Sequence, residues 1–428
     1  MDFSLTADDE AFRDELRAWL DTNLPKFLVD WGDDHSGSAP GEGPNDSPVE
    51  EAAEEAVERV VEDDRFARTQ ERRKDWQRRL DDGCWAAINW PREWNGREAT
   101  PMQNAIYAEE MARVRAPGIY NANGVWQIGP MILQWGTEEQ QQRWLPGILS
   151  ADEHWCQGFS EPEAGSDLAN MRTTAIHGVD DDGEHYVVNG QKTWISSAHL
   201  ARWGLFLLRT DPTAFERGAK HEGITAFIID MDTPGIECRP IRDLTGDTML
   251  NDVFFTDARI PLDCRLGGDD QGWQVAMSTL GHERVGTAGL SITMAGDLRA
   301  MISTARSVNP TALDDPELRE RIARAFTDIE LTRLLNYRAL TKILKGQPNW
   351  PEVPLAKLQW SKISQTLAEL GVDLLGPAGA LAKGGPDAVD GGRWTRDYGW
   401  QRYTSIGAGA TEIQKNILAK KALKLPKR

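Results

Sequence analysis

Two Gly- and Ser-rich segments of the chain have the composition of ligand-binding loops. Residues 158–175, GFSEPEAGSDLANMRTTA, leave hydroxyls and backbone N–H groups free, which suits a ligand rich in hydrogen-bond acceptors. Residues 405–416, SIGAGATEIQKN, present backbone at the start of a helix but carry no acid, base or nucleophile between Ser405 and Thr411. By local pattern alone, polar turns between two elements explain both segments equally well.

Glu283 is the side chain with the setting of a catalytic base. In STLGHERVGTAG, helical spacing places Glu283 on one face with residues that are apolar or weakly polar, namely Ala276, Leu280, Thr287 and Leu290. A lone glutamate on such a face is costly unless it has a partner or a function. Taken by itself, an ion pair with a neighbouring helix is the better explanation, because structural ion pairs outnumber catalytic carboxylates.

The spacing of apolar residues predicts the elements that must position these segments. Phe12, Leu16, Trp19 and Leu20 predict an amphipathic helix, and helical patterns continue to about residue 150. Residues 31–64 read as a turn-rich loop followed by an acidic helix. From residue 155 short apolar runs bounded by Gly, Pro and Asp predict strands, and the Asn-Gly pair in HYVVNGQKTWIS predicts a hairpin turn. Helical periodicity returns from Gly272 onward.

The order of helices, strands and helices favours an α+β fold with a β insert over an alternating parallel sheet. We therefore expect an N-terminal helical domain at 1–154, a β domain at 155–265 and a C-terminal helical domain at 266–428. No G-x-G-x-x-G motif follows a strand, so the pattern does not indicate a Rossmann site.

Composition excludes several classes of partner. With 48 Lys and Arg against 67 Asp and Glu, the formal net charge is −19, which disfavours nucleic acid and anionic membranes. The four cysteines are isolated and lack the spacing of a zinc site, so we expect no metal. The acidic N-terminus does not resemble a signal peptide, and no apolar run reaches membrane-spanning length. These features predict a cytoplasmic protein.

Further motifs reveal a family resemblance. Together with ILQWGTEEQQQRWLP, VVNGQKTWIS, FFTDARIP, HERVGTAG and TEIQKNILAKKALKLP, the two loop segments resemble the acyl-CoA dehydrogenase family over nearly the whole chain. Several separate motifs in the family's order are a stronger signal than any one of them. The resemblance implies an N-terminal helical domain, a central β-sandwich or barrel-like domain and a C-terminal four-helix bundle. It also implies FAD, an acyl-CoA substrate and electron-transfer flavoprotein as the electron acceptor.

The resemblance assigns roles to individual residues. The family's flavin contacts fall in QGFSEP and KTWIS, on Gln157, Phe159, Ser160, Trp194 and Ser196. Its CoA contacts fall on Ser166 and Arg284. Without these neighbours, Trp194 would read as a core residue of the β domain.

The chemistry of the family requires a carboxylate that takes the Cα proton while hydride passes from Cβ to flavin N5. In much of the family this glutamate lies in the C-terminal loop, where this chain has Ala408. Other branches, including steroid side-chain enzymes, place it at the position of Glu283, in the helix that reads LGHERVG here. The resemblance thus makes Glu283 the expected base. Backbone N–H groups at Ala408 and Gly409 keep the role of binding the thioester carbonyl, and Thr411 with Gln414 fits a capping box.

The chain differs from the family's pattern at three places. All three belong to the half of the FAD site that a neighbouring subunit contributes across the subunit interface. The family's R-x-x-F-G motif is absent, Asp373 stands where a glutamine is common, and Ala410 stands where a threonine is common. We therefore expect a subunit of a heteromer, such as a heterotetramer, that works beside a related subunit supplying these contacts. The alternatives are a self-sufficient homo-oligomeric dehydrogenase, a noncatalytic partner that binds CoA or scaffolds an active subunit, and a flavin monooxygenase of the same fold. Glu283 argues against the last two.

Overall fold

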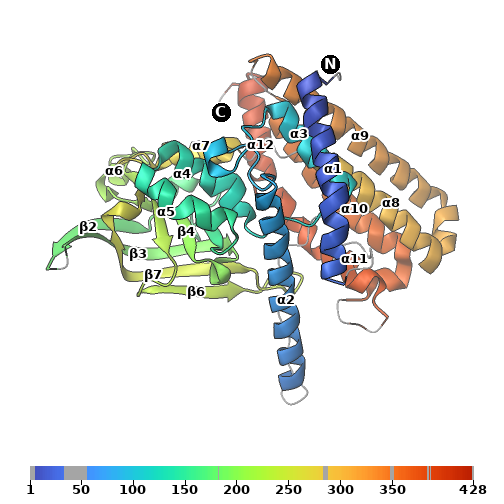
Figure 1. The fold of residues 1–428 in the computed structure, drawn as a ribbon, viewed down its shortest axis with the longest axis horizontal. Coiled ribbons are helices and arrows are strands. Elements are labelled where there is room, and N and C mark those ends of the chain that lie inside the picture. Colours follow the sequence, from blue (N-terminus) through green and yellow to red (C-terminus); the bar gives the residue numbers. More distant parts are fainter. Residues whose placement is uncertain are drawn as a thin grey trace.

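The β domain forms one end of the molecule, and helices from both ends of the chain pack together beside it, in the computed structural model, which describes residues 5–32, 55–181, 183–282, 288–347, 351–382, 385 and 387–426 (Figure 1). The acyl-CoA dehydrogenase arrangement expected from the resemblance, α+β with helices, sheet and helices in order, is confirmed. The N-terminal helices are α1 (Ala7–Asp30), α2 (Glu55–Asp82), α3 (Pro101–Arg113), α4 (Gly129–Trp135) and α5 (Glu138–Leu149). A short 3-10 turn (η1, Arg92–Trp94) follows α2, and a π-helical turn (η2, Gly124–Ile128) runs directly into α4.

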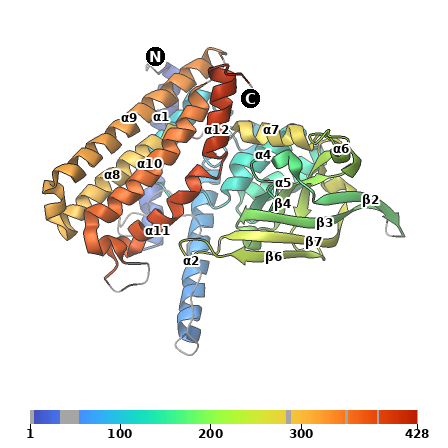
Figure 2. The same ribbon diagram turned by 180° about the vertical axis from the view of Figure 1, so that it is seen from behind.

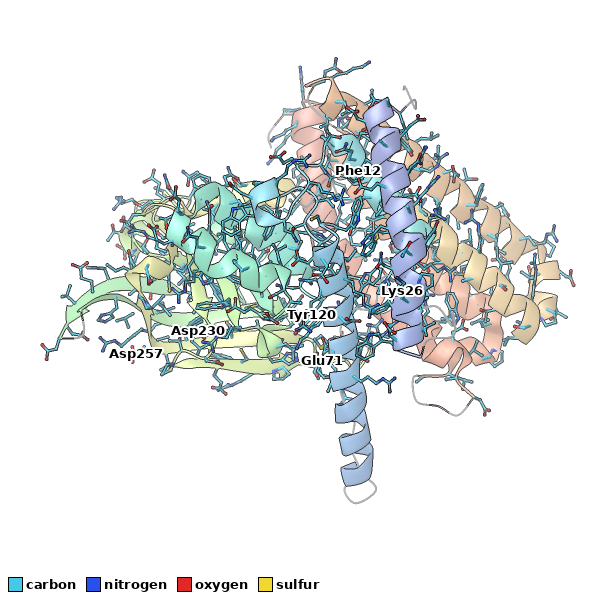
Figure 3. All side chains as sticks on the ribbon, in the orientation of Figure 1. Phe12, Lys26, Glu71, Tyr120, Asp230 and Asp257 are labelled. Atoms are coloured by element: carbon cyan, nitrogen blue, oxygen red, sulfur yellow. The ribbon has the colours of Figure 1, made fainter. Side chains whose placement is uncertain are left out.

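Helix α1 forms where the apolar spacing predicts it. Thr6 caps the helix by a reciprocal pair of hydrogen bonds with Asp9. Phe12, Leu16 and Leu20 are buried along one face, which packs into the core of the N-terminal domain (Figure 3). Helix α2 begins at Glu55 and its first turns project away from the rest of the chain (Figure 1). Most of the predicted acidic insert, residues 33–54, lies outside the described residues.

The central domain is one strongly bent sheet in the strand order β6-β7-β3-β2-β4-β5-β8, with β1 parallel to β4. Its long strands are β3 (Gly183–Ser196) and β7 (Leu250–Pro261), which pair antiparallel. The other strands are β1 (Trp155–Gly158), β2 (Thr174–Asp180), β4 (Trp203–Arg209), β5 (Ile224–Asp230), β6 (Ile236–Ile241) and β8 (Arg265–Leu266). Short helical turns η3 (Leu168–Asn170), η4 (Ala198–Leu200), η5 (Leu262–Cys264) and helix α6 (Pro212–Glu216) join them.

Strand β4 is buried on both faces because it serves two cores. Leu205 and Leu207 belong to the core shared with the N-terminal helices, whereas Phe206 and Leu208 point into the interior of the β domain. The same alternation continues in β5. Period-2 alternation in a strand that is apolar up to Arg209 therefore fixes α4 and α5 on one side of the sheet and the strand pair β3–β7 on the other. Figure 2 shows the sheet from behind, with the C-terminal helices beside it.

The hairpin predicted at the Asn-Gly pair is wrong. Asn189 and Gly190 lie inside the single long strand β3, and the chain reverses before it, between β2 and β3. The pair instead forms an irregularity in the β3–β7 pairing, where Asn189 Nδ2 donates to Asp257 Oδ1 at 3.0 Å. The backbone N–H of Asp257 returns a hydrogen bond to Asn189 Oδ1 at 2.9 Å. Tertiary pairing of Asn189 across the sheet thus replaces the local turn.

Gly190 has two constraints that a side chain would violate. Its φ is +143°, and a Cβ would lie 2.6 Å from Thr173 Oγ1 and 2.8 Å from Thr173 Cα. Gly190→Ala is expected to reduce the free energy of unfolding by about 3 kcal/mol, through backbone strain and overpacking together. Gly183→Ala is the matched control, since Gly183 also has a positive φ, +110°, but nothing near its Cβ. Thermal unfolding should rank Gly190→Ala clearly below Gly183→Ala, and equal melting temperatures would refute the steric contribution.

The C-terminal domain is helical, as predicted. Helix α7 (Gly272–His282) leads from the β domain to α8 (Ala288–Val308), α9 (Pro316–Leu344) and α10 (Glu352–Leu375), which pack on one another around a shared apolar core. Helices α11 (Arg393–Trp400) and α12 (Thr411–Ile417) contact α10. The connecting 3-10 turns are η6 (Pro310–Asp314), η7 (Gly376–Ala380), η8 (Val389–Gly392) and η9 (Gln401–Ser405), and a π-helical turn, η10 (Leu418–Ala422), follows α12.

The β domain and the C-terminal helices are joined by a partly buried ion pair. Arg396 Nε on α11 lies 3.1 Å from Asp247 Oδ2 in the loop before β7. Both side chains are nearly inaccessible to solvent, so the pair is more than a surface contact. The same loop leads into the part of β7 that pairs with the end of β3. No helix in the described part of the chain has the length and apolarity required to cross a bilayer.

Candidate functional site

The structure brings together the two segments predicted to contact flavin. Strand β1 ends at Gly158 and is followed by Phe159 and Ser160, while β3 carries Trp194 and Ser196 near its end. The backbone N–H of Thr193 donates to the carbonyl oxygen of Ser160 at 3.0 Å. β1 and β3 also contact each other directly. The segments QGFSEP and KTWIS therefore lie in contact although they are more than thirty positions apart in the sequence.

The side-chain oxygen of Gln157 has no hydrogen-bond partner among the described residues. This atom, Oε1, is buried. Buried polar atoms in native proteins are nearly always paired, so such an atom calls for a specific explanation. Phe159 beside it is buried, and Ser160 is half-buried. A ligand with a hydrogen-bond donor at its edge would satisfy Gln157 without any change in the fold.

Trp194 is held in an unusual conformation that exposes its ring. The pairing of β3 with β7 shifts between Lys192 and Ile195, and Trp194 takes a left-handed backbone with φ +60°. Ile195 remains buried in the β core, while Trp194 is 61% exposed. A bulky residue in this region costs about 1–3 kcal/mol, and such strain concentrates at ligand sites. Ser196 is exposed as well, and it pairs with Leu250 of β7.

Ser166, the predicted CoA contact, lies exposed in the turn between β1 and η3. A short antiparallel bridge between Glu161 and Ala164 folds the first part of this turn. Lys220 Nζ donates to Asp167 Oδ1 at 2.6 Å beside Ser166. Its neighbours thus fix the turn, while the Ser166 side chain remains accessible to a ligand.

Two buried charges hold this site together, and neither was singled out from the sequence. Lys192 Nζ on β3 lies 2.8 Å from Glu161 Oε1, and Lys192 is fully buried. Glu161 follows Ser160 directly, and Lys192 precedes Trp194 by two residues. The period-2 pattern of β3 was a usable signal, because Lys192 falls on an inward position between Val188 and Ile195.

The C-terminal loop that carries Ala408 and Gly409 is anchored by α10. Lys357 Nζ and Ser361 Oγ donate to the carbonyl oxygen of Thr404 at 2.5 and 2.7 Å. Burial lowers the pKa of Lys357, and the carboxylate of Glu412 opposes that shift. These contacts fix the chain at Thr404, immediately before the loop. They therefore hold the start of the loop and not the residues within it.

Ala408 and Gly409 present their backbone to solvent. Both are exposed, and both have positive φ, +52° and +87°. Their N–H groups donate to no group within the part of the chain that the structure describes. Two successive residues with free N–H groups provide donors for an anionic or carbonyl oxygen.

The capping box predicted for the last helix is wrong. Helix α12 begins at Thr411, so Ala410 is the residue before it, and no side chain caps the end. The Gln414 amide reaches over Gly409 instead, where its Nε2 lies 2.4 Å from the position of a Cβ. Glycine is therefore favoured at 409 for its backbone conformation, φ +87°, because the end of the flexible Gln414 side chain could move to make room for a Cβ.

Glu283 and Arg284, the predicted base and CoA contact, lie outside the described residues. The helix that precedes them is described. In α7, Ala276 and Thr279 are buried, and the helix contacts β4, β5 and η2. The turn η2 contacts β1 as well, so α7 and the Gln157 strand share a neighbour.

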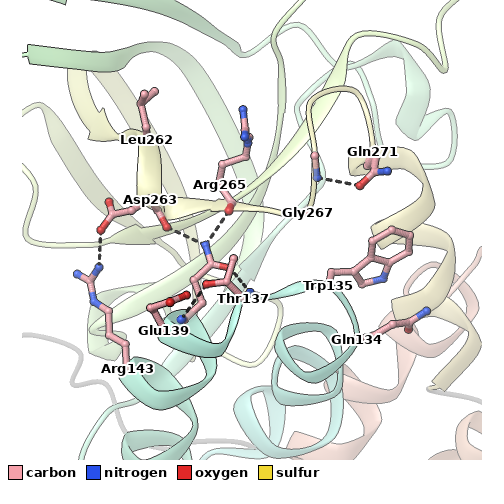
Figure 4. A pocket seen from close by; sticks show the side chains of 12 residues that line it. Gln134, Trp135, Thr137, Glu139, Arg143, Leu262, Asp263, Arg265, Gly267 and Gln271 are labelled. Carbon is pink, nitrogen blue, oxygen red and sulfur yellow. Dashed lines mark hydrogen bonds and ion pairs between the residues drawn. The ribbon is translucent and has the colours of Figure 1, made fainter.

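A cavity of about 720 Å³ lies elsewhere, between α5, β8 and the start of α7 (Figure 4). Gln140 Nε2 bridges its walls by donating to the carbonyl oxygens of Asp263 and Arg265, at 2.7 and 2.8 Å. Arg143 and Arg265 line it, but they pair with Asp263 and Asp269. None of the predicted site residues that the structure describes lines this cavity. We interpret it as a junction between the N-terminal helices and the β domain.

Family models of three successive domains match the chain. They are the acyl-CoA dehydrogenase N-terminal domain at 46–152, middle domain at 156–258 and C-terminal domain at 270–423. Acyl-CoA dehydrogenase IpdE1 of Mycobacterium tuberculosis is 39% identical over 359 residues, which cover 83% of this chain and 89% of that protein. The human mitochondrial short-chain specific acyl-CoA dehydrogenase is 30% identical over 78% of each chain.

Two solved structures share the whole architecture. The Tcur3481-Tcur3483 steroid ACAD matches with a TM-score of 0.77 at 26% identity, covering 100% of both chains. The ChsE4-ChsE5 complex from Mycobacterium tuberculosis matches with a TM-score of 0.74 at 27% identity, again over 100% of both chains.

Proposed function

Since the chain belongs to the acyl-CoA dehydrogenase family, we propose that it uses Glu283 to remove the Cα proton of a bound acyl-CoA thioester. Members of this family are flavin-dependent oxidoreductases that act on CH–CH bonds, and the cofactor is FAD. The proposal concerns which residues of this chain perform each part of the reaction. The observation that carries it is the unpaired buried oxygen of Gln157 on β1, together with the exposed ring of Trp194 on the contacting strand β3.

The residues of the β domain fit the isoalloxazine of FAD. When bound, FAD supplies the acceptor for the hydride that leaves Cβ. Gln157 and Ser160 would hold the polar edge of the ring system, and Trp194 would cover one face, with Phe159 and Ser196 beside them. This assignment accounts for the unpaired Gln157 oxygen and for the strained backbone of Trp194.

The C-terminal loop contributes donors and not an acid. Its free N–H groups at Ala408 and Gly409 would bind the thioester carbonyl oxygen, which gains negative charge as the Cα proton leaves. The loop does not need a side chain for this task, which is consistent with alanine at 408. The acid–base role then passes to Glu283, with Arg284 and Ser166 on the CoA moiety.

We further propose that the chain works beside a second, related subunit. Asp373 on α10, which stands where a glutamine is common in the family, pairs within this chain: Arg321 Nη1 on α9 donates to Asp373 Oδ2 at 2.7 Å. The R-x-x-F-G motif is also missing. This chain therefore lacks the arginine, the phenylalanine and the glutamine with which one subunit of the family commonly contacts the FAD of its neighbour. The two similar structures, Tcur3481-Tcur3483 and ChsE4-ChsE5, are each named as a pair of proteins. Electron-transfer flavoprotein is the acceptor that the family resemblance favours.

Gln157→Leu tests the flavin assignment. The substitution keeps the side-chain volume but removes the unpaired oxygen, so the Kd for FAD is expected to rise about fivefold to tenfold, equivalent to about 1 kcal/mol. Quenching of flavin fluorescence during titration of the apoprotein, coexpressed with its partner, measures this. Gln141→Leu on α5 is the matched control and should leave the Kd unchanged. Equal affinity of Gln157→Leu and the original protein would remove Gln157 from the site.

A further inference from the structure

Glu161 and Lys192 form the most thoroughly connected buried ion pair near the site. Lys192 is 0% exposed and Glu161 is 7% exposed. Lys192 Nζ donates to Glu161 Oε1 at 2.8 Å and to the carbonyl oxygen of Phe159 at 3.3 Å. The Glu161 carboxylate also accepts the backbone N–H groups of Arg172 and Thr173, at 2.6 and 3.0 Å. Each of these hydrogen bonds therefore ends on a segment of the candidate site, and Arg209 on β4 is a further charge close to the pair.

The pair connects three stretches of chain, and its buried charges add to the hydrogen bonds that also join them, from the Thr193 N–H to the Ser160 carbonyl oxygen and from Thr173 Oγ1 to the Gln191 carbonyl oxygen. Lys192 belongs to the strand that exposes Trp194, and Glu161 follows the segment that carries Gln157 and Ser160. Arg172 and Thr173 close the turn that carries Ser166. If one of these segments moved relative to the others, a hydrogen bond to a buried charge would lengthen. Such a movement is unfavourable because hydrogen bonds to charged groups are short, directional and strong.

The cost of burying these charges indicates that they are kept for more than stability. Burial would raise the pKa of Glu161, but the charge and hydrogen bond of Lys192 and the donors at Thr173 and Arg172 outweigh it, so its pKa is lowered. Burial lowers the pKa of the Lys192 ammonium, and the charge of Glu161 opposes that shift. Apolar residues of similar volume often stabilise a protein as well as a buried ion pair or better, so a specific geometry is the better reason to keep one.

We propose that Glu161 and Lys192 are positioning residues that set the spacing between the 157–160 segment, the Trp194 bulge and the Ser166 turn before cofactor binds. They touch neither cofactor nor substrate. Their effect on the reaction passes through the residues that they place. This inference rests on the proposed function in one respect, the assignment of residues 157–160 and 194–196 to FAD.

The position of the bulge supports this role. The pairing of β3 with β7 is regular from Gly190 to Lys192 and shifts immediately after Lys192, before Ile195. Lys192 is thus the last regularly paired residue before the strained Trp194 backbone, and its side chain is fixed in the interior. Positive φ at Trp194 persists only if the surroundings hold it there. The Thr193 hydrogen bond to Ser160 then couples the strained segment to the neighbouring loop.

The test compares two variants with the original protein, each in the full chain coexpressed with its partner. Glu161→Gln/Lys192→Met removes both charges and is the main variant, because Glu161→Gln alone would leave Lys192 buried without a counter-ion. The matched control is Lys220→Met, which breaks the exposed Lys220–Asp167 pair in the same turn. The double variant is expected to fold but to bind FAD with a Kd raised about tenfold, because binding must now order the site. Visible circular dichroism of the bound flavin should change as well, and Lys220→Met should match the original protein in both measurements.

A merely structural pair would give a different result. The double variant would then melt at a lower temperature while its FAD affinity and flavin dichroism stayed unchanged, which would overturn the proposal. A measurement on the unmodified chain covers the case of variants that fail to fold. Hydrogen exchange should show the amides of Arg172, Thr173 and Thr193 already protected without FAD. Rapid exchange that is suppressed only by FAD would also contradict a preformed arrangement.

The same titrations separate this inference from the proposed function. If Gln157→Leu weakens FAD binding and the double variant does not, the flavin site stands and the positioning role fails. If the double variant weakens FAD binding and Gln157→Leu does not, the pair acts on other flavin contacts and the assignment of Gln157 fails.

Discussion

Replacing Glu283 with glutamine is expected to leave FAD and acyl-CoA bound while reduction of the flavin by acyl-CoA slows by about 10²- to 10⁴-fold, the usual contribution of a general base. Glutamine keeps the size and the hydrogen-bonding capacity of the side chain but does not accept a proton. The loss should therefore appear in the rate of the chemical step and not in substrate affinity. Anaerobic stopped-flow absorbance of the oxidised flavin band measures that step directly.

Two further variants make the Glu283 experiment specific. Glu320→Gln on α9 changes an exposed glutamate paired with Arg324 and should reduce its flavin at the original rate. Ala408→Glu, added to Glu283→Gln, places a carboxylate where other branches of the family have theirs and should restore part of the rate. The backbone of Ala408 is left-handed, φ +52°, so glutamate there carries some strain. Reduction at the original rate in Glu283→Gln would end the assignment of the base.

The second large effect concerns flavin content. The chain expressed alone is expected to purify with little FAD, whereas coexpression with a related subunit that carries R-x-x-F-G should give a flavin-loaded complex. The reason is electrostatic and geometric: this chain has Asp373 paired with its own Arg321, and it lacks the arginine and phenylalanine that the motif would contribute. Absorbance of the purified proteins, together with their mass in solution, measures both flavin and assembly.

A partner variant provides the control for this prediction. Replacing the arginine of the partner's R-x-x-F-G motif by alanine should release FAD from the complex without dissociating the subunits. A stable homo-oligomer of this chain that is fully loaded with FAD would reject the heteromer. It would leave the dehydrogenase function intact.

The sequence predicts those helices and strands whose buried face follows from the regular spacing of apolar residues. The apolar stripe of α1 and the continuous apolar strands β4 and β5 both appear where their spacing places them. Asn189-Gly190 misled because a turn signal is local, and the partner of Asn189, Asp257, is 68 residues away. Tertiary pairing across a sheet overrides such a signal.

The residues expected to contact flavin could be predicted from the sequence. The buried ion pair that lies behind them, Glu161 and Lys192, could not. The family resemblance located Gln157 and Trp194 in one site, and the structure brings their strands into contact. The role of Lys192 was hidden because a lysine in a strand is assigned to a solvated face by default. Lys192 is buried instead because it pairs with Glu161. The two residues are 31 positions apart, so no local sequence pattern indicates their contact.

The most direct test of the account mixes the flavin-loaded complex with acyl-CoA esters of increasing size under anaerobic conditions, while absorbance follows the flavin and mass spectrometry follows the ester. We predict that one class of ester bleaches the oxidised flavin band and loses two hydrogen atoms to become the α,β-unsaturated thioester. Bound acyl-CoA with no bleaching for any ester, or a product that has gained oxygen once air is admitted, would contradict the assignment of this chain as a dehydrogenase subunit.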